Sequence, residues 1–256
     1  MNWALIGLGF ISERHIKSIV ETGGRLLMTC DVDESKNPTF TNWRKMIASP
    51  EWKQVTHVSI CTPNYLHVEM ASAMSNKVVL CEKPLGLSAA EISTLGENVF
   101  TVLQLRHHPA SKPRPKPKNG RLIVRVKRDQ SYWDGWKGDE KKSGGILFNL
   151  GVHYFDLLLQ LFGEKYVVKY SWYSPWYAEG TIDFDGSLVK YQLEIRLTND
   201  GQERSITLDG EELVLSKQDN LSFENLHVKV FWDLRSGKGI SVKEALPSIR
   251  LIEQLK

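Results

Sequence analysis

The first hundred residues repeat a short apolar strand followed by a helix, and this rhythm constrains the fold more than any other feature of the chain. Strands are expected at residues 3–7, 26–30, 56–61, 77–81 and 99–105, and helices at 13–21, 43–48, 66–75 and 88–97. Strands that alternate with helices form βαβ units, in which the strands pair in parallel and the helices cover the sheet. The sequence therefore predicts an α/β domain with a doubly wound parallel sheet.

The stretch between the second and third expected strands is short for this architecture. A doubly wound sheet usually places a full helix and a further strand there. Residues 33–48 have room only for the helix expected at 43–48. We therefore expect a trimmed sheet.

The turn after the first strand resembles the dinucleotide-binding fingerprint. It reads Gly7-Leu8-Gly9-Phe10-Ile11-Ser12, with Ser12 in the place of the third glycine. Gly7 would allow the tight turn, and Gly9 would let the backbone approach a pyrophosphate at the start of a helix. The expected strand before the loop and helix after it are the context that this motif requires. The loop, including Phe10 and Ile11, is therefore predicted to bind a dinucleotide.

A carboxylate follows the second expected strand, which ends at Cys30. Asp31 lies about 20 residues beyond the glycine loop, the usual distance in this motif. Its side chain can accept hydrogen bonds from both ribose hydroxyls and would repel a 2′-phosphate, which favours NAD over NADP. A plain turn aspartate is the alternative, and Asp33 is a second candidate for the ribose contact.

Polar residues also follow the third and fourth expected strands, at the sheet edge where ligands bind. Thr62-Pro63-Asn64 could line the cofactor groove, although Asn64 could instead cap the next helix. His67 lies in the first turn of that helix, as a cofactor contact or as a structural residue. Glu82-Lys83-Pro84 ends an apolar strand with two charges and a proline. Lys83 is either part of an exposed turn or an active-site lysine.

The regular alternation of strands and helices ends after Leu105. A connector with prolines between basic residues covers 111–120, and strand-like runs follow at 122–127, 166–172, 178–184, 188–197 and 203–208. Asp-Gly pairs separate several of these runs, as in hairpins. We therefore predict an NAD-binding domain over 1–106 and an α+β domain with a mostly antiparallel sheet over 107–256.

One apolar helix interrupts these strands, expected over 143–162 with Gly163 at its end. Asn149, His153 and Asp156 follow at spacings that align them on one face. A buried polar stripe must be hydrogen-bonded or functional. We interpret this polar face as part of a functional site. The alternative is that His153 is a structural residue of the core whose hydrogen bonds are made within the protein.

Charge and cysteine content narrow the class of protein. The formal net charge of +3 is too small to favour nucleic acid or a membrane surface as a partner. The N-terminus has no basic leader pattern, and no membrane-spanning segment is expected. Cys30, Cys61 and Cys81 each end an apolar run, which predicts buried free thiols and neither disulfides nor a metal site. These features predict a cytoplasmic protein.

Three motifs together resemble the glucose–fructose oxidoreductase and inositol dehydrogenase family. They are Glu82-Lys83-Pro84, Thr62-Pro63-Asn64 followed by His67, and Gly151-x-His153-x-x-Asp156. The resemblance implies an N-terminal NAD(P)-binding domain and a cis Lys83–Pro84 peptide bond. It also implies a homo-oligomer, a dimer or tetramer, that forms through the open face of the C-terminal sheet. Lys83 and His153 would be the catalytic pair.

Asn149 departs from the aspartate that many family members carry. Together with Gln104-Leu105-Arg106, Trp136-Lys137-Gly138-Asp139 and Lys142-Ser143-Gly144-Gly145, it is similar to the branch that oxidises C3 of UDP-N-acetylglucosamine or its uronate. In that branch the 3-keto product is converted by an aminotransferase to a 3-amino sugar for lipopolysaccharide, either lipid A or O-antigen. Arg106, Trp136, Lys137, Asn149 and His153 are the substrate-binding residues that this resemblance suggests.

The chemistry implied by the resemblance gives each residue a role. His153 would accept the hydroxyl proton, held by Asn149 or Asp156, and Lys83 would hydrogen-bond the same oxygen. Glu82 would pair with Lys83 or contact the nicotinamide ribose. Two other functions remain open: a family dehydrogenase acting on a free polyol or monosaccharide, and a non-catalytic regulator that binds a dinucleotide.

Overall fold

The computed structural model of the chain describes residues 1–198, 200–215 and 224–256. The chain forms two compact units, each built on one six-stranded sheet. The first unit comprises Met1–Gly86, Ala90–Val102 and Glu224–Ala245, and the second comprises Leu87–Ala89, Leu103–Phe223 and Leu246–Lys256.

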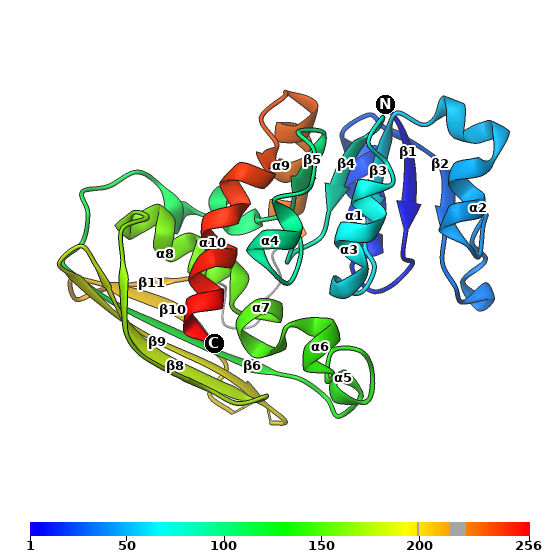
Figure 1. The fold of residues 1–256 in the computed structure, drawn as a ribbon. Helices are drawn as coiled ribbons and strands as arrows, with labels where there is room; N and C mark the ends of the chain where they lie inside the picture. Colours follow the sequence, from blue (N-terminus) through cyan, green and yellow to red (C-terminus); the bar gives the residue numbers. More distant parts are fainter. Residues whose placement is uncertain (199, 216–223) are drawn as a thin grey trace. The chain divides into compact units, whose positions relative to one another are not determined.

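The predicted parallel sheet is the centre of the first unit (Figure 1). Its parallel strands stand in the order β5 (Val99–Thr101), β4 (Val78–Cys81), β3 (His57–Ile60), β1 (Asn2–Ile6), β2 (Arg25–Cys30). A short strand, β12 (Ile240–Ser241), adds antiparallel to β5. Ile6 pairs with both Cys30 and Ile60, and Ile60 pairs with Cys81. The residues that follow these strands therefore lie along one edge of the sheet.

The sheet is trimmed beside β2, as predicted. Within the described residues, the chain beyond β2 makes one isolated bridge, between Cys30 and Phe40. Helix α2 (Trp43–Ala48) lies where the sequence placed it, and a 3₁₀ turn, Pro50–Gln54, leads to β3. Two expected helices are shorter than predicted: α3 (His67–Ser72), which contacts β3 and β4, and α4 (Ala89–Ile92).

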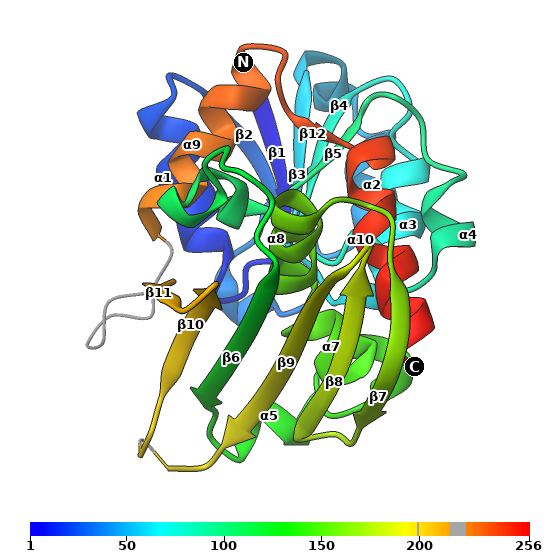
Figure 2. The same ribbon diagram turned by 90° about the vertical axis from the view of Figure 1, so that its left-hand side faces the viewer.

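Two helices from opposite ends of the chain pack against this sheet. They are α1 (Ser12–Glu21) and α9 (Glu224–Arg235), which lie side by side in Figures 1 and 2. Ile19 of α1 and Phe231 of α9 share a core cluster with Trp3 of β1. The predicted boundary at residue 106 is therefore corrected. Residues 224–245 return to the first unit because the apolar face of α9 completes its core, and 103–106 belong to the second unit.

The second unit contains the mostly antiparallel sheet that the Asp-Gly turns predict (Figure 2). Its order is β11 (Glu211–Val214), β10 (Glu203–Leu208), β6 (Asn119–Lys127), β9 (Ser187–Arg196), β8 (Tyr177–Phe184), β7 (Val167–Tyr173). Among these strands, β6 and β9 pair in parallel and the other neighbours are antiparallel. Asp185 and Gly186 join β8 to β9 with φ of 51° and 91°, the backbone that such a tight turn needs. The strand β11 was not predicted.

One face of this sheet is covered and the other is open. Exposure alternates along β6, β8 and β9, as expected for strands with one buried face. Phe155 and Phe162 of α8 (Val152–Phe162) contact Tyr191 and Phe184 on the covered face. The remaining helices are α5 (Ser131–Asp134), α6 (Glu140–Ser143), α7 (Gly145–Asn149) and α10 (Val242–Leu255).

The single helix predicted over 143–162 is wrong, because α6, α7 and α8 divide this segment. Gly144, with φ of 80°, separates α6 from α7. Gly151 precedes α8, and a Cβ there would lie 2.3 Å from the carbonyl oxygen of Leu147 and 3.0 Å from Leu193 Cδ1. Only a glycine fits this close approach. Gly163, with φ of 89°, ends α8 as expected.

Residues 140–162 form a segment long and apolar enough to cross a membrane by composition alone. However, 83% of its most apolar window is buried inside the protein. Packing against the second sheet therefore accounts for its apolar character. Cys30, Cys61 and Cys81 are buried free thiols, as predicted.

Candidate active site

The glycine loop joins β1 to α1 at the carboxyl edge of the first sheet. Gly7 has φ of 92°, and a Cβ there would lie 2.6 Å from the carbonyl oxygen of Cys61. Gly9 differs, because nothing lies within 4 Å of an added Cβ, so its backbone borders open space. The Ser12 hydroxyl donates to the Gly9 carbonyl at 2.5 Å and closes the loop at the first residue of α1. The strand, loop and helix that the motif requires are therefore present.

Asp31, directly after β2, turns its carboxylate toward this loop. Its Oδ2 accepts from the Leu8 amide at 2.6 Å and from Lys36 Nζ at 3.1 Å, and its Oδ1 accepts from the Asp33 amide at 2.9 Å. Burial raises the pKa of Asp31, but these hydrogen bonds and the Lys36 charge outweigh burial and hold the pKa below its usual value. Asp31 is therefore ionised at neutral pH. Asp33 caps a short 3₁₀ turn by accepting from the Ser35 amide.

These residues fit an NAD molecule. The open backbone at Gly9 and the amides at the start of α1 suit a pyrophosphate, and the anionic Asp31 suits a ribose diol. Phe10 is 78% exposed and Ile11 is half-buried on the same loop. The individual contacts of these side chains with the cofactor remain predictions.

Replacing Asp31 by asparagine tests its role in choosing the cofactor. Asparagine can still accept from the Leu8 amide, but the negative charge is lost and Lys36 is released toward a 2′-phosphate. We expect the preference for NAD⁺ over NADP⁺, measured as the ratio of kcat/KM, to fall about 10-fold or more. The Asp33→Asn variant is the matched control, because Asp33 is exposed and also faces Lys36. An unchanged ratio in Asp31→Asn would contradict the assignment.

His67 joins the loops that follow β3 and β4. It is fully buried, with Nδ1 2.7 Å from the Pro84 carbonyl oxygen and Nε2 2.9 Å from that of Thr62. Burial lowers the pKa of His67, against the opposing effect of these two carbonyls. A neutral imidazole ring can donate to only one of these two carbonyls at a time, so the buried His67 side chain lies between the two loops and contacts both. A direct cofactor contact by His67 remains a prediction.

Thr62 and Asn64 lie in the first of these loops. Thr62 is half-buried, and its hydroxyl contacts Met70 Sδ at 3.5 Å. Asn64 is buried and begins a 3₁₀ turn, Asn64–Leu66, while Leu66 is the N-cap of α3. The alternative role of Asn64 as the cap of α3 is therefore wrong. Its predicted place in the cofactor groove is untested, as is that of Thr62.

The second loop carries Glu82, Lys83 and Pro84. The Lys83–Pro84 peptide bond is cis, as the family resemblance implies. Lys83 is half-buried, and its backbone amide donates to Glu82 Oε2 at 3.2 Å. Glu82 is 7% exposed, and its Oε1 lies 2.8 Å from His15 Nε2. The predicted pairing of Glu82 with the Lys83 side chain, like its predicted contact with the nicotinamide ribose, remains a prediction.

His15 and His227 were missed in the sequence analysis, although both reach Glu82. His227 Nε2 lies 3.5 Å from Glu82 Oε1. The polar residues Ser12, His15 and Ser18 recur every third position and form the buried face of α1, a signal that could have indicated His15. No comparable signal exists for His227, because α9 reaches β4 only through tertiary packing.

In the second unit, Arg106 and Asp156 form a buried ion pair. Arg106 Nε and one terminal nitrogen donate to the two carboxylate oxygens of Asp156 at 2.9 and 2.7 Å. Their side chains are 16% and 2% exposed. This fork-to-fork geometry is among the strongest polar contacts in proteins. The ion pair with Asp156 positions the Arg106 side chain. The contact of Arg106 with substrate remains a prediction.

His153 and Asn149 lie on either side of the break between α7 and α8. His153 is 6% exposed in the first turn of α8. Asn149 ends α7, and its amide nitrogen donates to the Tyr132 hydroxyl. The break replaces the continuous polar stripe that one helix would have given. The proposed holding of His153 by Asn149 or Asp156 remains a prediction.

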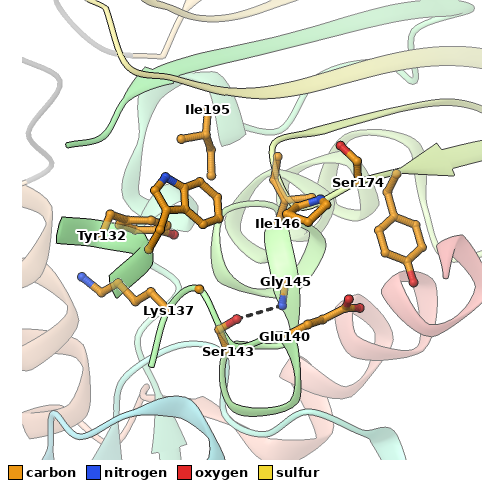
Figure 3. A pocket seen from close by; sticks show the side chains of 12 residues that line it. Tyr132, Lys137, Glu140, Ser143, Gly145, Ile146, Ser174 and Ile195 are labelled. Atoms are coloured by element: carbon orange, nitrogen blue, oxygen red, sulfur yellow. Dashed lines mark hydrogen bonds between the residues drawn. The ribbon is translucent and has the colours of Figure 1, made fainter. Parts of the chain in front are cut away.

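An open pocket in the second unit is lined in part by Tyr132 (Figure 3). Aromatic rings, charges and small polar groups line it, including Tyr132, Trp133, Lys137, Glu140, Ser143 and Tyr173. Lys137 Nζ lies 5.1 Å from the Tyr132 ring centre and 5.8 Å from that of Trp136. Of the five predicted substrate residues, Lys137 lines this pocket, and Asn149 is linked to it through Tyr132. Tyr132 was not singled out by sequence.

Comparison with known protein families identifies the family of this chain. Residues 1–99 match the NAD-binding Rossmann fold of an oxidoreductase family, and residues 119–212 match the C-terminal alpha/beta domain of the same family, Gfo/Idh/MocA. The chain belongs to this family. The family is the glucose–fructose oxidoreductase and inositol dehydrogenase family indicated by the motifs, so the resemblance and the NAD cofactor are confirmed.

Solved structures and curated sequences give individual relatives. A crystal structure of the WlbA (WbpB) dehydrogenase from Thermus thermophilus, in complex with NAD and UDP-GlcNAcA, is 32% identical; the match covers 100% of this chain and 94% of that chain, with a TM-score of 0.87. The inositol 2-dehydrogenase/D-chiro-inositol 3-dehydrogenase of Lactiplantibacillus plantarum is 22% identical over 63% of this chain and 52% of its own length. The levoglucosan dehydrogenase of Pseudarthrobacter phenanthrenivorans is 26% identical over 57% of this chain and 42% of its own. This chain thus spans about half or less of the curated relatives that it matches.

Proposed function

We propose that this protein uses NAD⁺ to oxidise the C3 hydroxyl of UDP-N-acetylglucosamine or its uronate to a 3-keto sugar. The observation that carries the proposal is the 32% identity, over the whole chain, to a dehydrogenase crystallised with NAD and UDP-GlcNAcA. Membership of an NAD-dependent oxidoreductase family supports the reaction type. The Glu82-Lys83-Pro84 motif, through the family to which the chain belongs, supports an alcohol as the reacting group.

The proposed roles of the residues follow from the chemistry of alcohol oxidation. NAD⁺, when bound, supplies the acceptor for the hydride that leaves C3. His153 accepts the hydroxyl proton, which leaves the oxygen electrons to form the carbonyl. Lys83 donates a hydrogen bond to the same oxygen and stabilises the negative charge that develops there. Asp31 and the glycine loop hold the ribose and pyrophosphate of the cofactor.

The pocket of the second unit supports a nucleotide sugar as the substrate. Its aromatic rings can stack on a base or a sugar, and Lys137 can face a diphosphate. Trp133 packs on Trp176 with ring centres 3.7 Å apart, which gives this wall a fixed aromatic surface. We propose that Trp136 and Arg106 also contact the substrate. A free polyol would use little of this lining.

A substrate panel tests the proposed function. Purified protein is mixed with NAD⁺ and UDP-N-acetylglucosamine, its uronate, myo-inositol or glucose, and NADH formation is followed by absorbance. A coupled aminotransferase removes the keto product, so that a tightly held product does not hide the reaction. We expect turnover with at least one UDP-sugar. Turnover with inositol or glucose alone would favour the alternative of a polyol or monosaccharide dehydrogenase. The similarity to an inositol dehydrogenase supports that alternative. NAD binding without turnover of any sugar would favour a regulator.

We further propose that the protein forms a homo-oligomer through the open face of the second sheet. Val167, Tyr170 and Trp172 of β7 and Leu188 of β9 form an apolar patch on this face, each about half exposed. Val167 and Leu188 both pair with Asp183 of β8, so the patch spans three neighbouring strands. Exposed apolar residues on a sheet face and at its edge strand are typical of an interface.

Light scattering after size-exclusion chromatography tests this interface. A Tyr170→Glu/Trp172→Glu double variant is expected to weaken self-association about 30-fold or more, because each ring is a candidate hot spot. Val32→Glu is the control, since Val32 is an 88% exposed apolar residue of the first unit. The same oligomer in wild type and double variant would argue against this face.

The 3-keto product that we propose is chemically suited to an aminotransferase. On this basis we propose a cytoplasmic role in making 3-amino sugars for lipopolysaccharide. Detection of the 3-amino sugar nucleotide in a coupled reaction tests this step, and its absence despite 3-keto product would refute it.

A further inference from the structure

A buried ionic cluster adjoins Lys83 within the first unit. Glu82 lies at its centre, at the end of β4 and directly before Lys83. His15 of α1 and His227 of α9 approach the same carboxylate oxygen at 2.8 and 3.5 Å. All three residues are almost fully buried. Three elements from distant parts of the chain, β4, α1 and α9, thus meet at the residue that precedes the proposed catalytic lysine.

The donors in this cluster form one directed chain. Burial raises the pKa of the Cys61 thiol well above its usual value, so it stays protonated and can donate to Ser59 Oγ at 3.6 Å. Ser59 Oγ lies 2.7 Å from His15 Nδ1, and His15 Nε2 lies 2.8 Å from Glu82. Burial lowers the pKa of His15, so its ring is neutral and carries one proton. Because an ionised Glu82 can only accept, that proton is on Nε2, and Nδ1 accepts from the Ser59 hydroxyl.

Glu82 is the acceptor at the end of this chain. Burial raises the pKa of Glu82, but the hydrogen bonds of His15 and His227 outweigh burial and hold it well below its usual value. The carboxylate is therefore ionised. Its second oxygen accepts from the Lys83 amide at 3.2 Å. The backbone of Lys83 is thus tied to α1 and α9 through one anion.

The cost of burying this anion argues for a purpose beyond packing. Removing a carboxylate from water is unfavourable, and apolar residues of similar volume often stabilise a core equally well. The cluster also stands at the carboxyl edge of the sheet, beside the glycine loop and Asp31, where ligands bind in this fold. Functional groups there need support from neighbouring residues that hold them to within a fraction of an ångström.

We propose that His15, Glu82 and His227 act as positioning residues for Lys83 in catalysis. The two histidines orient the Glu82 carboxylate, and this carboxylate fixes the backbone from which the lysine side chain extends. The inference rests on the proposed function, in which Lys83 binds the reacting oxygen. It assigns no direct contact with substrate to the three residues.

Kinetics of matched variants test the proposal. Glu82→Gln keeps the shape and removes the charge, and His15→Leu removes the donor. For each we expect kcat to fall about 10- to 100-fold, the loss expected for a hydrogen bond to a charged group. KM for NAD⁺ should change less than about threefold, because the glycine loop and Asp31, which would hold the pyrophosphate and ribose, keep their own hydrogen bonds in these variants. His15→Gln, whose amide can donate to Glu82, should recover most of kcat.

A second measurement does not depend on turnover. Exchange of the Lys83 amide hydrogen, separated from that of Leu85 by NMR or by overlapping longer peptides, reports on this hydrogen bond. We expect faster exchange in Glu82→Gln and His15→Leu, and near-wild-type exchange in His15→Gln. If wild type oxidises no sugar, the proposed function fails, while exchange still tests the positioning.

Three results would overturn the inference. One is wild-type kcat together with wild-type exchange in folded Glu82→Gln. Another is a fall in kcat that His15→Gln shares equally with His15→Leu. The third is a stoichiometric transition metal in the purified protein bound by His15, Glu82 and His227, because these atoms lie close enough to share an ion. If Glu82→Gln fails to fold, the two His15 variants decide between support and rejection.

Discussion

Replacing Lys83 by methionine is expected to lower kcat by about 10³-fold while leaving NAD binding within a few-fold of wild type. Methionine keeps most of the length of the side chain and removes the donor that would stabilise the developing oxyanion. Loss of one such donor typically costs 10²- to 10³-fold. Stopped-flow turnover with the UDP-sugar found active, together with fluorescence titration of NADH, separates catalysis from cofactor binding.

The His153→Asn variant completes this experiment. We expect a loss of about 10²- to 10⁴-fold, typical for a general base. Because both residues would act on one proton-transfer step, the double variant should lose much less than the product of the two single losses. Lys45→Met is the control, since Lys45 is an exposed lysine of α2. Full activity in folded Lys83→Met would refute the catalytic assignment.

The elements that the sequence predicted well are those governed by local pattern. The first sheet follows from apolar runs that alternate with helices, and the second from alternating strands that end at Asp-Gly turns. In both cases neighbouring residues decide the outcome. The break at residues 150–151 was missed, because the close packing that requires Gly151, with Leu193 of β9 3.0 Å from the place of an added Cβ, leaves no trace in apolar periodicity.

The candidate site likewise contains residues that a local sequence motif predicted and residues that only the tertiary fold brings together. The glycine loop and Asp31 were predictable because their motif has fixed spacing and a required strand and helix around it. The partners of Glu82 were not, since His227 comes from a helix that joins the first unit from the far end of the chain. Asp156 was, by helical spacing, one of two candidates for holding His153, together with Asn149. The structure pairs Asp156 with Arg106, which only the fold brings near.

The Arg106–Asp156 pair also gives the largest expected effect on stability. Asp156→Ala would leave the Arg106 guanidinium buried without its carboxylate, and breaking a buried pair in this way costs about 3–5 kcal/mol. We expect that decrease in the free energy of unfolding, measured by urea denaturation with tryptophan fluorescence. Asp129→Ala is the control, because Lys127–Asp129 is a more exposed ion pair of the same unit and should contribute less than about 1 kcal/mol.

A double variant separates the cost of an unpaired charge from the value of the pair. Arg106→Leu/Asp156→Leu removes both charges and is expected to recover most of the lost stability, because a buried ion pair often contributes little more than apolar side chains of similar volume. If the double variant is stable but its KM for the UDP-sugar rises, Arg106 also contacts substrate. If it is stable with unchanged kinetics, the pair serves the fold alone. A double variant as unstable as Asp156→Ala would show that this position requires the charged pair itself.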